Sequence, residues 1–383
     1  MKVGVVGVGH SKFGKRSEST IRDLSHEAVK PAFDEAGLTP RDVDAIVFSL
    51  AGDQFNGQGS PAALVSDYVG TQDSAPIRIE SACASGSAAL KAGAAFIEAG
   101  IHDKVLVVAT ESMSHVSTPE ATEMMSRAGD MVWEFPFGVS FPAYYAIYAS
   151  RRMAEGLTRA QLSAIPVKSH EYGALNPNGH LQKNVTLEEA MKSIIIAHPL
   201  NLYDCCPISD GSAAAILTSE KTAKELTDTP VWISGIGTSG DTMQIADRPN
   251  LTNLGGAQRA GEIAYKMAGI EPKDVSFAEV HDCFSIAELM AYEDLGFCPQ
   301  GEGGKFAEDG EMYVGGKTPV NVDGGLKSKG HPVGATGVSQ CYEITRQLRG
   351  DVTGKRSVEG ADIALQHNVG MHGTFVNVLI YQR

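Results

Sequence analysis

Cys83 is the residue of this chain best placed for covalent chemistry. It lies in the segment Glu80-Ser-Ala-Cys-Ala-Ser-Gly-Ser87, and residues 90–98 after it read as a helix. At a helix N-terminus, the macrodipole and the free N–H groups lower the pKa of a thiol, and the thiolate is the nucleophilic form. Taken alone, Cys83 fits a buried structural cysteine equally well, so its role depends on the segments that accompany it.

His331 is the candidate base for this thiol. It lies in Gly330-His-Pro-Val-Gly-Ala-Thr-Gly337, a glycine-rich turn that precedes a predicted helix over residues 338–348. An imidazole with a pKa near 6.5 can accept the thiol proton, which is the usual way of activating a cysteine. If the chain contains two similar halves, this turn and the Cys83 turn face each other, and His331 then lies beside Cys83.

Two further segments carry reactive groups. His281-Asp-Cys-Phe284 follows a predicted strand over residues 277–280, and it supplies a second imidazole and a second thiol, Cys283, where ligand sites of α/β sheets collect. His367-Asn-Val-Gly370 follows a strand over residues 363–366, and the Val369–Gly370 turn offers backbone N–H groups for an oxyanion. Four such segments in this order are hard to explain as core packing.

The elements that position these residues follow an α/β pattern. Short apolar runs alternate with helical patterns, which predicts βαβ units and a mostly parallel, buried sheet. A helix is expected over residues 21–36, although Pro31 should bend or shorten it. The other expected strands cover residues 3–8, 45–48, 105–109, 213–217, 231–234 and 374–380.

An internal sequence repeat indicates duplication. Residues 32–43 reappear as residues 264–275, and in both copies a helix ends at glycine, proline opens a turn, and a buried strand follows. Such a unit could also recur by chance in an α/β protein. We interpret residues 1–113 with 205–228 as one core half, residues 229–383 as the other, and residues 114–204 as an inserted loop or lid subdomain.

The insertion is rich in aromatic residues and contains a long polar loop. A segment of this kind suits a lid that covers a substrate. The alternative, favoured for most of its aromatic residues, is that they fill the core or a subunit interface.

Composition excludes several classes of function. The 383 residues carry a net charge of −14 without any run of basic residues, so nucleic acid is not expected as a partner. The six cysteines form no Cys-x-x-Cys pair, and no metal site is predicted. Cys205, Cys206, Cys298 and Cys341 are expected to be structural. No apolar stretch approaches membrane-spanning length and no signal peptide is recognised, so we expect a cytoplasmic location.

Together, these segments make the chain resemble the thiolase superfamily over essentially its whole length. The resemblance rests on Cys-x-Ser at residue 83, Asp210-Gly-Ser-Ala-Ala214, the His281-Asp-Cys-Phe box, the Gly330-His-Pro box and the closing His-Asn-Val-Gly segment. It is closest to the archaeal and sterol-carrier-protein type, and it implies a duplicated, five-layered α-β-α-β-α fold. Most thiolases carry Asn-Glu-Ala-Phe and Cys-x-Gly where this chain has the His281 and His367 segments. The resemblance therefore implies that Cys283 is the acid/base.

The implied activity is that of an acetoacetyl-CoA thiolase, an acetyl-CoA C-acetyltransferase, which makes or cleaves a carbon–carbon bond through an acyl-Cys83 intermediate. His281 and His331 with a water would donate to the thioester oxygen, and the backbone N–H groups of Cys83 and the Val369–Gly370 turn would hold the tetrahedral oxyanion. Coenzyme A is then a substrate or product, and no permanently bound cofactor is expected. Lys327 and Lys329 could meet its phosphates, or they could be solvated surface lysines.

Several alternatives remain open at this point. They are a 3-ketoacyl-CoA thiolase for longer chains, a ketoacyl or hydroxymethylglutaryl-CoA synthase, and a non-catalytic thiolase-like assembly partner. Those synthases need no second thiol, so Cys283 argues against them. The resemblance also implies a homodimer or homotetramer, a complex with hydroxymethylglutaryl-CoA synthase through a small zinc-binding scaffold protein, and a place in isoprenoid precursor biosynthesis.

Overall fold

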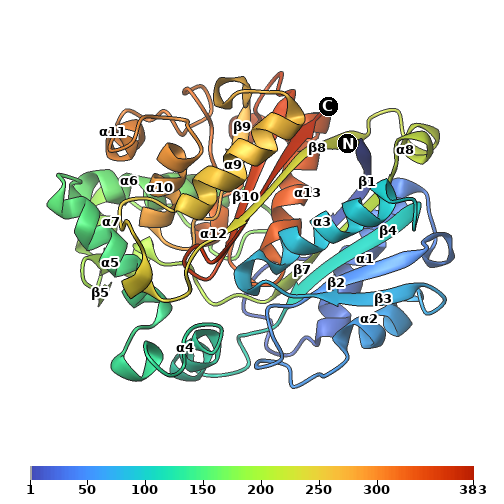
Figure 1. Cartoon of the computed structure of the whole chain (residues 1–383), viewed down its shortest axis with the longest axis horizontal. Helices are drawn as coiled ribbons and strands as arrows, with labels where there is room; N and C mark the ends of the chain where they lie inside the picture. The colour runs from blue at the N-terminus through green and yellow to red at the C-terminus, as the bar shows by residue number, and fades with distance from the viewer. Residues whose placement is uncertain (1) are drawn as a thin grey trace.

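The computed structural model describes residues 2–383, in which strands and helices alternate over much of the chain, with two runs of consecutive helices, α4–α7 and α10–α13 (Figure 1). The strands are β1 Val3–His10, β2 Ala45–Ser49, β3 Ala75–Ile79, β4 Lys104–Glu111, β5 Ile195–Ala197, β6 Leu200–Asn201, β7 Gly211–Ser219, β8 Val231–Gly240, β9 Phe277–Glu279, β10 Ile363–Gly370 and β11 Phe375–Gln382. The α-helices are α1 Ile21–Ala36, α2 Pro61–Val69, α3 Ser85–Glu98, α4 Thr118–Ser126, α5 Phe141–Ala154, α6 Arg159–Gly173, α7 Leu187–Lys192, α8 Glu220–Leu226, α9 Gly255–Ala268, α10 Ser285–Asp294, α11 Gly303–Glu308, α12 Gly325–Ser328 and α13 Thr336–Arg349.

One large mixed sheet runs through the molecule in the order β3-β2-β4-β7-β1-β8-β11-β10-β9. Only β2 with β3, β2 with β4, and β9 with β10 pair in parallel, so the expectation of a mostly parallel sheet is wrong. The physical reason is plain at β10 and β11, because residues 371–374 between them are too few for the crossover that parallel strands need.

The fold has the five layers that were expected. The two central helices, α3 and α13, pack in a core that strand residues from both halves line, including Val5, Val107 and Leu379. Helices α1 and α2 cover the outer face of the first half, and α9 and α10 cover that of the second. The halves of the sheet join at β1 and β8, where only Val3–Val5 pair with Val231–Ile233. Both sheet halves therefore face the central helices.

In both halves, a glycine in a strand allows a helix to pack closely against that strand. A Cβ added at Gly9 of β1 would stand 1.9 Å from the carbonyl oxygen of Ala28 in α1. A Cβ added at Gly237 of β8 would stand 1.8 Å from the carbonyl oxygen of Ala260 in α9. Glycine is required at both crossings because the backbones touch there. This correspondence supports duplication over a chance recurrence.

Some local expectations need correction. Helix α1 runs through Pro31 to Ala36, so the proline does not shorten it. Strand β3 and the small β5–β6 hairpin were not predicted. Among the aromatic residues of the insertion, Tyr145 and Tyr148 are fully buried, as the core alternative expects, whereas Trp133 is 69% exposed. Within residues 2–383 we find no helix that is both long and apolar enough to cross a bilayer.

Candidate active site

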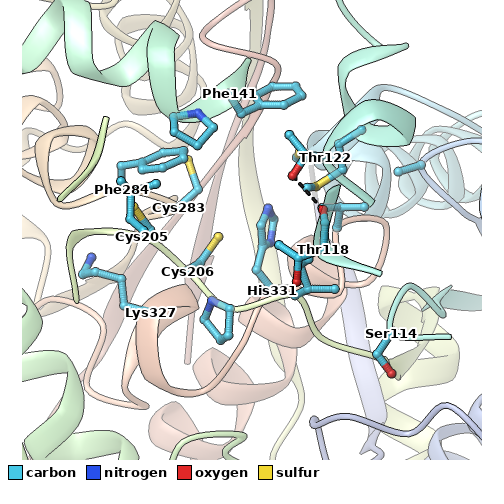
Figure 2. Close-up of a pocket in the computed structure, with 18 of the residues that line it drawn as sticks. Ser114, Thr118, Thr122, Phe141, Cys205, Cys206, Cys283, Phe284, Lys327 and His331 are labelled. Atoms are coloured by element: carbon cyan, nitrogen blue, oxygen red, sulfur yellow. Dashed lines mark hydrogen bonds between the residues drawn. The ribbon is translucent and has the colours of Figure 1, made fainter. Parts of the chain in front are cut away.

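A cavity of about 540 Å³ lies where the two halves meet the insertion. Cys83, Cys283 and His331 all line it, which brings together segments that lie up to 248 positions apart in the chain. In the view of Figure 2, Cys283 lies opposite Thr118 and Thr122 of helix α4, with His331 drawn between them. The insertion therefore forms one wall of the cavity.

The Cys83 turn is held in an uncommon backbone conformation. Cys83 belongs to a short 3-10 helix, Ala82–Ala84, that leads directly into α3. Ala82 has a φ of 49°, in the left-handed region that residues other than glycine rarely adopt. Such conformations persist only where the surroundings impose them, and they cluster at functional sites. The turn is built to present the thiol that follows.

Burial decides the protonation of Cys83. It raises the pKa of the thiol to about 12, and the carboxyl group of Glu111 acts in the same direction. The backbone N–H groups of Met371 and of Cys83 itself favour the thiolate but do not outweigh burial. The expectation that the helix N-terminus would lower the pKa is therefore wrong as a net effect. The thiol needs a base.

His331 fits that role. Burial lowers its pKa to about 3, so the imidazole is neutral. Its Nδ1 lies 2.6 Å from Oγ1 of Thr336, whose hydroxyl donates in turn to the carbonyl of Pro332. The Thr336 oxygen therefore accepts from Nδ1–H, and Nε2 keeps a lone pair. That lone pair can take the proton of a neighbouring thiol.

His281 stands beside His331, with ring centroids 5.1 Å apart and the rings nearly perpendicular. Burial and the neighbouring His331 hold the pKa of His281 well below its usual value, so this imidazole is neutral too. Its Nε2 is buried and has no hydrogen-bond partner within residues 2–383.

Ligand atoms of Cys83, His281 and His331 all lie within 4.8 Å of one another, so the predicted convergence of the Cys83 and His331 turns is confirmed. One thiol and two neutral imidazoles form a donor set that Zn²⁺ accepts in proteins. These three residues are the ones that could hold a metal. Their alternative use is to polarise and attack a carbonyl group.

Cys283 lines the same cavity and is buried. Burial raises the pKa of its thiol, and a hydrogen bond with the hydroxyl of Tyr145 opposes that shift. The carbonyl of Cys283 accepts from the backbone N–H of Cys206 at 3.0 Å. The second thiol is thus a protonated acid at neutral pH, fixed to the wall of the cavity.

Lys327 and Lys329 are not surface lysines. Both are almost fully buried. The ammonium of Lys327 pairs with Asp282 at 2.7 Å and with Glu288 at 3.3 Å, and that of Lys329 pairs with Asp323. Carboxylates pair with both charges, and Lys327 also lines the cavity. Lys327 holds Asp282, between His281 and Cys283, in place.

The oxyanion turn also lies later than expected. Val369 and Gly370 are strand residues, paired with Val376 and Phe375 of β11, and they do not form a turn. The first residue beyond β10 is Met371, whose φ is 61° and whose N–H lies against the Cys83 thiol. The backbone N–H that lies against the thiol is therefore that of Met371, and Val369 and Gly370 form no turn here.

Several residues of the site were not predicted from the sequence. Cys205 and Cys206, expected to be structural, line the cavity, and so does Lys15, an exposed lysine from the first half. Asn368 contacts both Cys83 and His281. The position of Asn368 directly after His367, in a segment already singled out, was a signal that could have identified it. Lys15 offered no such signal.

Family models cover nearly the whole chain. Residues 3–221 match the thiolase N-terminal domain, and residues 237–383 match the thiolase C-terminal domain-like family. An acetyl-CoA acetyltransferase of Methanothermobacter thermautotrophicus is 42% identical over 383 residues, which span 100% of this chain and 99% of the relative. Sterol carrier protein 2 of Oryctolagus cuniculus is 35% identical over 396 residues, covering 99% of this chain and 71% of the relative.

Solved structures agree in fold. The Ltp2-ChsH2(DUF35) aldolase superimposes with a TM-score of 0.87 at 27% identity, over 100% of this chain and 97% of that one. Human mitochondrial 3-ketoacyl-CoA thiolase, solved in complex with CoA, gives a TM-score of 0.78 at 20% identity, over 100% and 98% of the two chains. At that identity the second likeness concerns the fold alone.

Proposed function

The chain belongs to the thiolase family and is an acyltransferase, and from this premise we propose that it interconverts two acetyl-CoA molecules with acetoacetyl-CoA and free CoA through an acyl-Cys83 intermediate. The observation that carries the proposal is the convergence of Cys83, His281 and His331 within 4.8 Å, beside a cavity that Cys283 also lines. The archaeal relatives named acetyl-CoA acetyltransferase support the choice of acyl group.

In the cleavage direction, Nε2 of His331 takes the Cys83 proton, and the thiolate attacks the keto carbon of the substrate. The bond between that carbon and C2 breaks, its electron pair passes to the acetyl-CoA enolate, and Cys283 delivers a proton to C2. Cys283 then deprotonates CoA, and the CoA thiolate takes the acyl group from Cys83, whose thiolate leaves and recovers its proton from His331. Condensation runs the same steps in reverse.

N–H donors stabilise the negative charge that develops on oxygen during the reaction. His281 faces the thioester oxygen that becomes the enolate oxygen, while the N–H groups of Cys83 and Met371 face the oxyanion of the tetrahedral intermediate. Loss of one such donor costs about 3–4 kcal/mol of transition-state stabilisation. Coenzyme A is a substrate and product here. We assign its negative charges to Lys15, because that lysine lines the cavity and is exposed.

The first experiment measures acylation. Wild-type protein incubated with acetyl-CoA should gain the mass of one acetyl group, and Cys83→Ala should gain none. Cys298→Ala is the matched control, since Cys298 is a buried cysteine absent from the cavity lining. An unacylated wild type would favour the non-catalytic assembly partner. Undiminished acylation of Cys83→Ala would remove Cys83 from its role.

The second experiment separates the two thiols. Cys283→Ala should still acylate Cys83 but should lose exchange of the α-protons of acetyl-CoA with deuterated solvent, because no acid/base remains at C2. Retained exchange would favour a synthase-like site without a second thiol. Comparing acetoacetyl-CoA with longer 3-ketoacyl-CoA substrates then tests the chain-length alternative.

For assembly, we propose a homodimer or homotetramer, and a complex with hydroxymethylglutaryl-CoA synthase through a small zinc-binding scaffold protein. Support comes from the solved Ltp2-ChsH2(DUF35) aldolase, whose matched chain has this fold and whose name joins two components. Light scattering of the purified chain tests the first proposal. Co-purification of the three proteins, with and without the scaffold, tests the second.

A further inference from the structure

Asn368 joins two parts of the site that lie far apart in the chain. It lies in β10 and is fully buried. Its side-chain nitrogen stands 3.1 Å from the carbonyl oxygen of Cys83 and 3.2 Å from Nδ1 of His281. The same amide therefore touches the backbone of the nucleophile and the ring of a histidine beside it.

The Cys83 carbonyl selects one orientation of the amide, in which Oδ1 is buried and has no hydrogen-bond partner within residues 2–383. If it were turned over, its oxygen would face the carbonyl oxygen of Cys83, and two acceptors would meet without a proton between them. In the observed orientation the oxygen lies against Gly337 of α13, where a Cβ would stand 2.5 Å from it. The absence of a side chain at Gly337 provides this space. The Cys83 carbonyl thus fixes which end of Asn368 faces His281.

This orientation determines the tautomer of His281. An amide N–H can only donate, so Nδ1 of His281 must carry a lone pair. A neutral imidazole has one N–H, which is therefore on Nε2, a buried atom that has no hydrogen-bond partner in the described chain. His331 has the opposite arrangement, with its proton on Nδ1 toward Thr336. One histidine presents a donor and the other an acceptor.

We propose that Asn368 is a positioning residue that selects the Nε2–H tautomer of His281, and thereby keeps the cluster of Cys83, His281 and His331 an oxyanion-binding site and prevents it from acting as a metal centre. The catalytic half of this inference rests on the proposed function. The tautomer and the metal affinity do not, and both can be measured without turnover.

The contact between Asn368 and His281 is unsuited to a histidine that binds a metal. A metal-bound histidine uses the lone pair of one ring nitrogen, and its other nitrogen donates N–H to a carbonyl, carboxylate or water. At His281 the second nitrogen meets a donor, so Nε2 cannot offer its lone pair without losing that contact. The three ligand atoms are close enough for a metal. However, Asn368 donates to the second ring nitrogen of His281, where a metal-bound histidine needs an acceptor.

The first test reads the tautomer in the wild-type protein. Long-range ¹H–¹⁵N correlation spectra of protein labelled in histidine distinguish a protonated ring nitrogen from one with a lone pair, and the loss of one signal set in His281→Gln assigns His281. We expect His281 to be protonated at Nε2 and His331 at Nδ1. Protonation of His281 at Nδ1 would overturn the proposal, whatever the activity of the protein.

The second test reverses the selection with Asn368→Asp. A carboxylate accepts, so Nδ1 of His281 should become the protonated nitrogen and Nε2 should become free to bind metal. Co²⁺ is the probe, because a cysteine ligand gives a sulfur-to-cobalt charge-transfer band. We expect the variant to bind Co²⁺ on the order of 10–100-fold more tightly than the wild type. Adding Cys83→Ala to the variant should remove the band.

Asn377→Asp is the matched control. Asn377 lies directly opposite Asn368 on β11, and its side chain contacts Ser87 and Thr238 and makes no contact with His281. This change places the same charge in the same sheet, so its Co²⁺ affinity should stay at the wild-type value. An equal gain in both variants would overturn the proposal, because charge alone would explain it. So would an unchanged His281 tautomer in Asn368→Asp.

Activity provides a separate readout. Asn368→Asp should lose about 10²–10³-fold in kcat through the missing oxyanion donor. If Asn368→Asp does not fold, the wild-type tautomer alone decides the proposal. Failure of the proposed function appears elsewhere, as a wild type that acetyl-CoA does not acylate, so the two failures are distinguishable.

Discussion

Burial lowers the pKa of both His281 and His331 and raises that of the Cys83 thiol, so all three groups are neutral at pH 7. The sequence identified these residue types, because reactive groups in glycine-rich turns form a pattern that core packing does not produce. It could not give the direction of the Cys83 shift, since the helix N-terminus is visible in the sequence and the surrounding low dielectric is not. The burial of Lys327 and Lys329 was not visible in the sequence either, which is why a surface position was considered for both.

Glu111 offers a test of this electrostatic setting. Its carboxyl accepts from the backbone N–H groups of Ala51 and Gly334, and burial raises its pKa to about 8. A carboxyl whose pKa is higher in the folded than in the unfolded state stabilises fully below pH 4.5, its ordinary value, and loses that contribution as the pH rises through 8.

We therefore expect the free energy of unfolding of the wild type to fall relative to that of Glu111→Gln, by about 1.4 kcal/mol for each pH unit between those values. Urea unfolding of both proteins at pH 5, 6.5 and 8 measures the difference. Glu225→Gln, the same replacement at an exposed position of α8, is the control measured beside it. A constant difference for Glu111→Gln would contradict the assignment of its pKa.

At the scale of helices and strands, the place where a helix packs on the sheet depends on where the strand allows the helix to approach closely. The spacing of glycine and alanine was visible in the sequence, and the similarity between residues 32–43 and 264–275 indicated the repeated unit. The direction of the strands was harder to predict, because burial on both faces gives the same apolar runs in parallel and antiparallel strands. The short connection after β10 was the signal that could have corrected it.

Gly237→Ala tests the contact between β8 and α9. The added Cβ would meet a backbone carbonyl at 1.8 Å, and backbone cannot move aside without shifting the helix. We expect the variant to be about 3 kcal/mol less stable, at the upper end of the usual cost of overpacking. Thermal unfolding measures this loss. Gly59→Ala should be neutral, since no heavy atom lies within 4 Å of the added Cβ, and an equally stable Gly237→Ala would argue against the close crossing.

At the scale of the whole molecule, the site exists because the two halves meet at the starts of their central helices. A Cβ at Gly86 of α3 would lie 2.9 Å from the backbone nitrogens of Gly337 and Val338 in α13. The sequence predicted that the two turns would face each other, because duplicated halves place equivalent turns about a common centre. It could not predict the shape of the cavity, since that depends on how the insertion folds over both halves.

Gly86→Ala should separate these two helices and with them Cys83 from His331. We expect a loss of about 1–3 kcal/mol in stability, and a drop in the rate of Cys83 acylation that exceeds any change in substrate binding, because the nucleophile and its base move apart. Burst-phase acylation and equilibrium CoA binding, measured side by side, separate these effects. Gly14→Ala, where the added Cβ meets open space, should change neither. Equal losses in acylation and binding would instead indicate general unfolding.

The left-handed backbone of Ala82, one residue before the nucleophile, has a consequence for engineering the protein. Replacement by glycine would relieve an unfavourable conformation, which for residues other than glycine costs about 1–3 kcal/mol, although the greater freedom of the unfolded chain offsets part of that gain. The same replacement would let the thiol sample directions that the alanine forbids. At position 82, thermal stability and the fixed direction of the catalytic thiol therefore favour different residues. A search for thermostable variants scored by melting temperature alone would select glycine there, at a cost in catalysis.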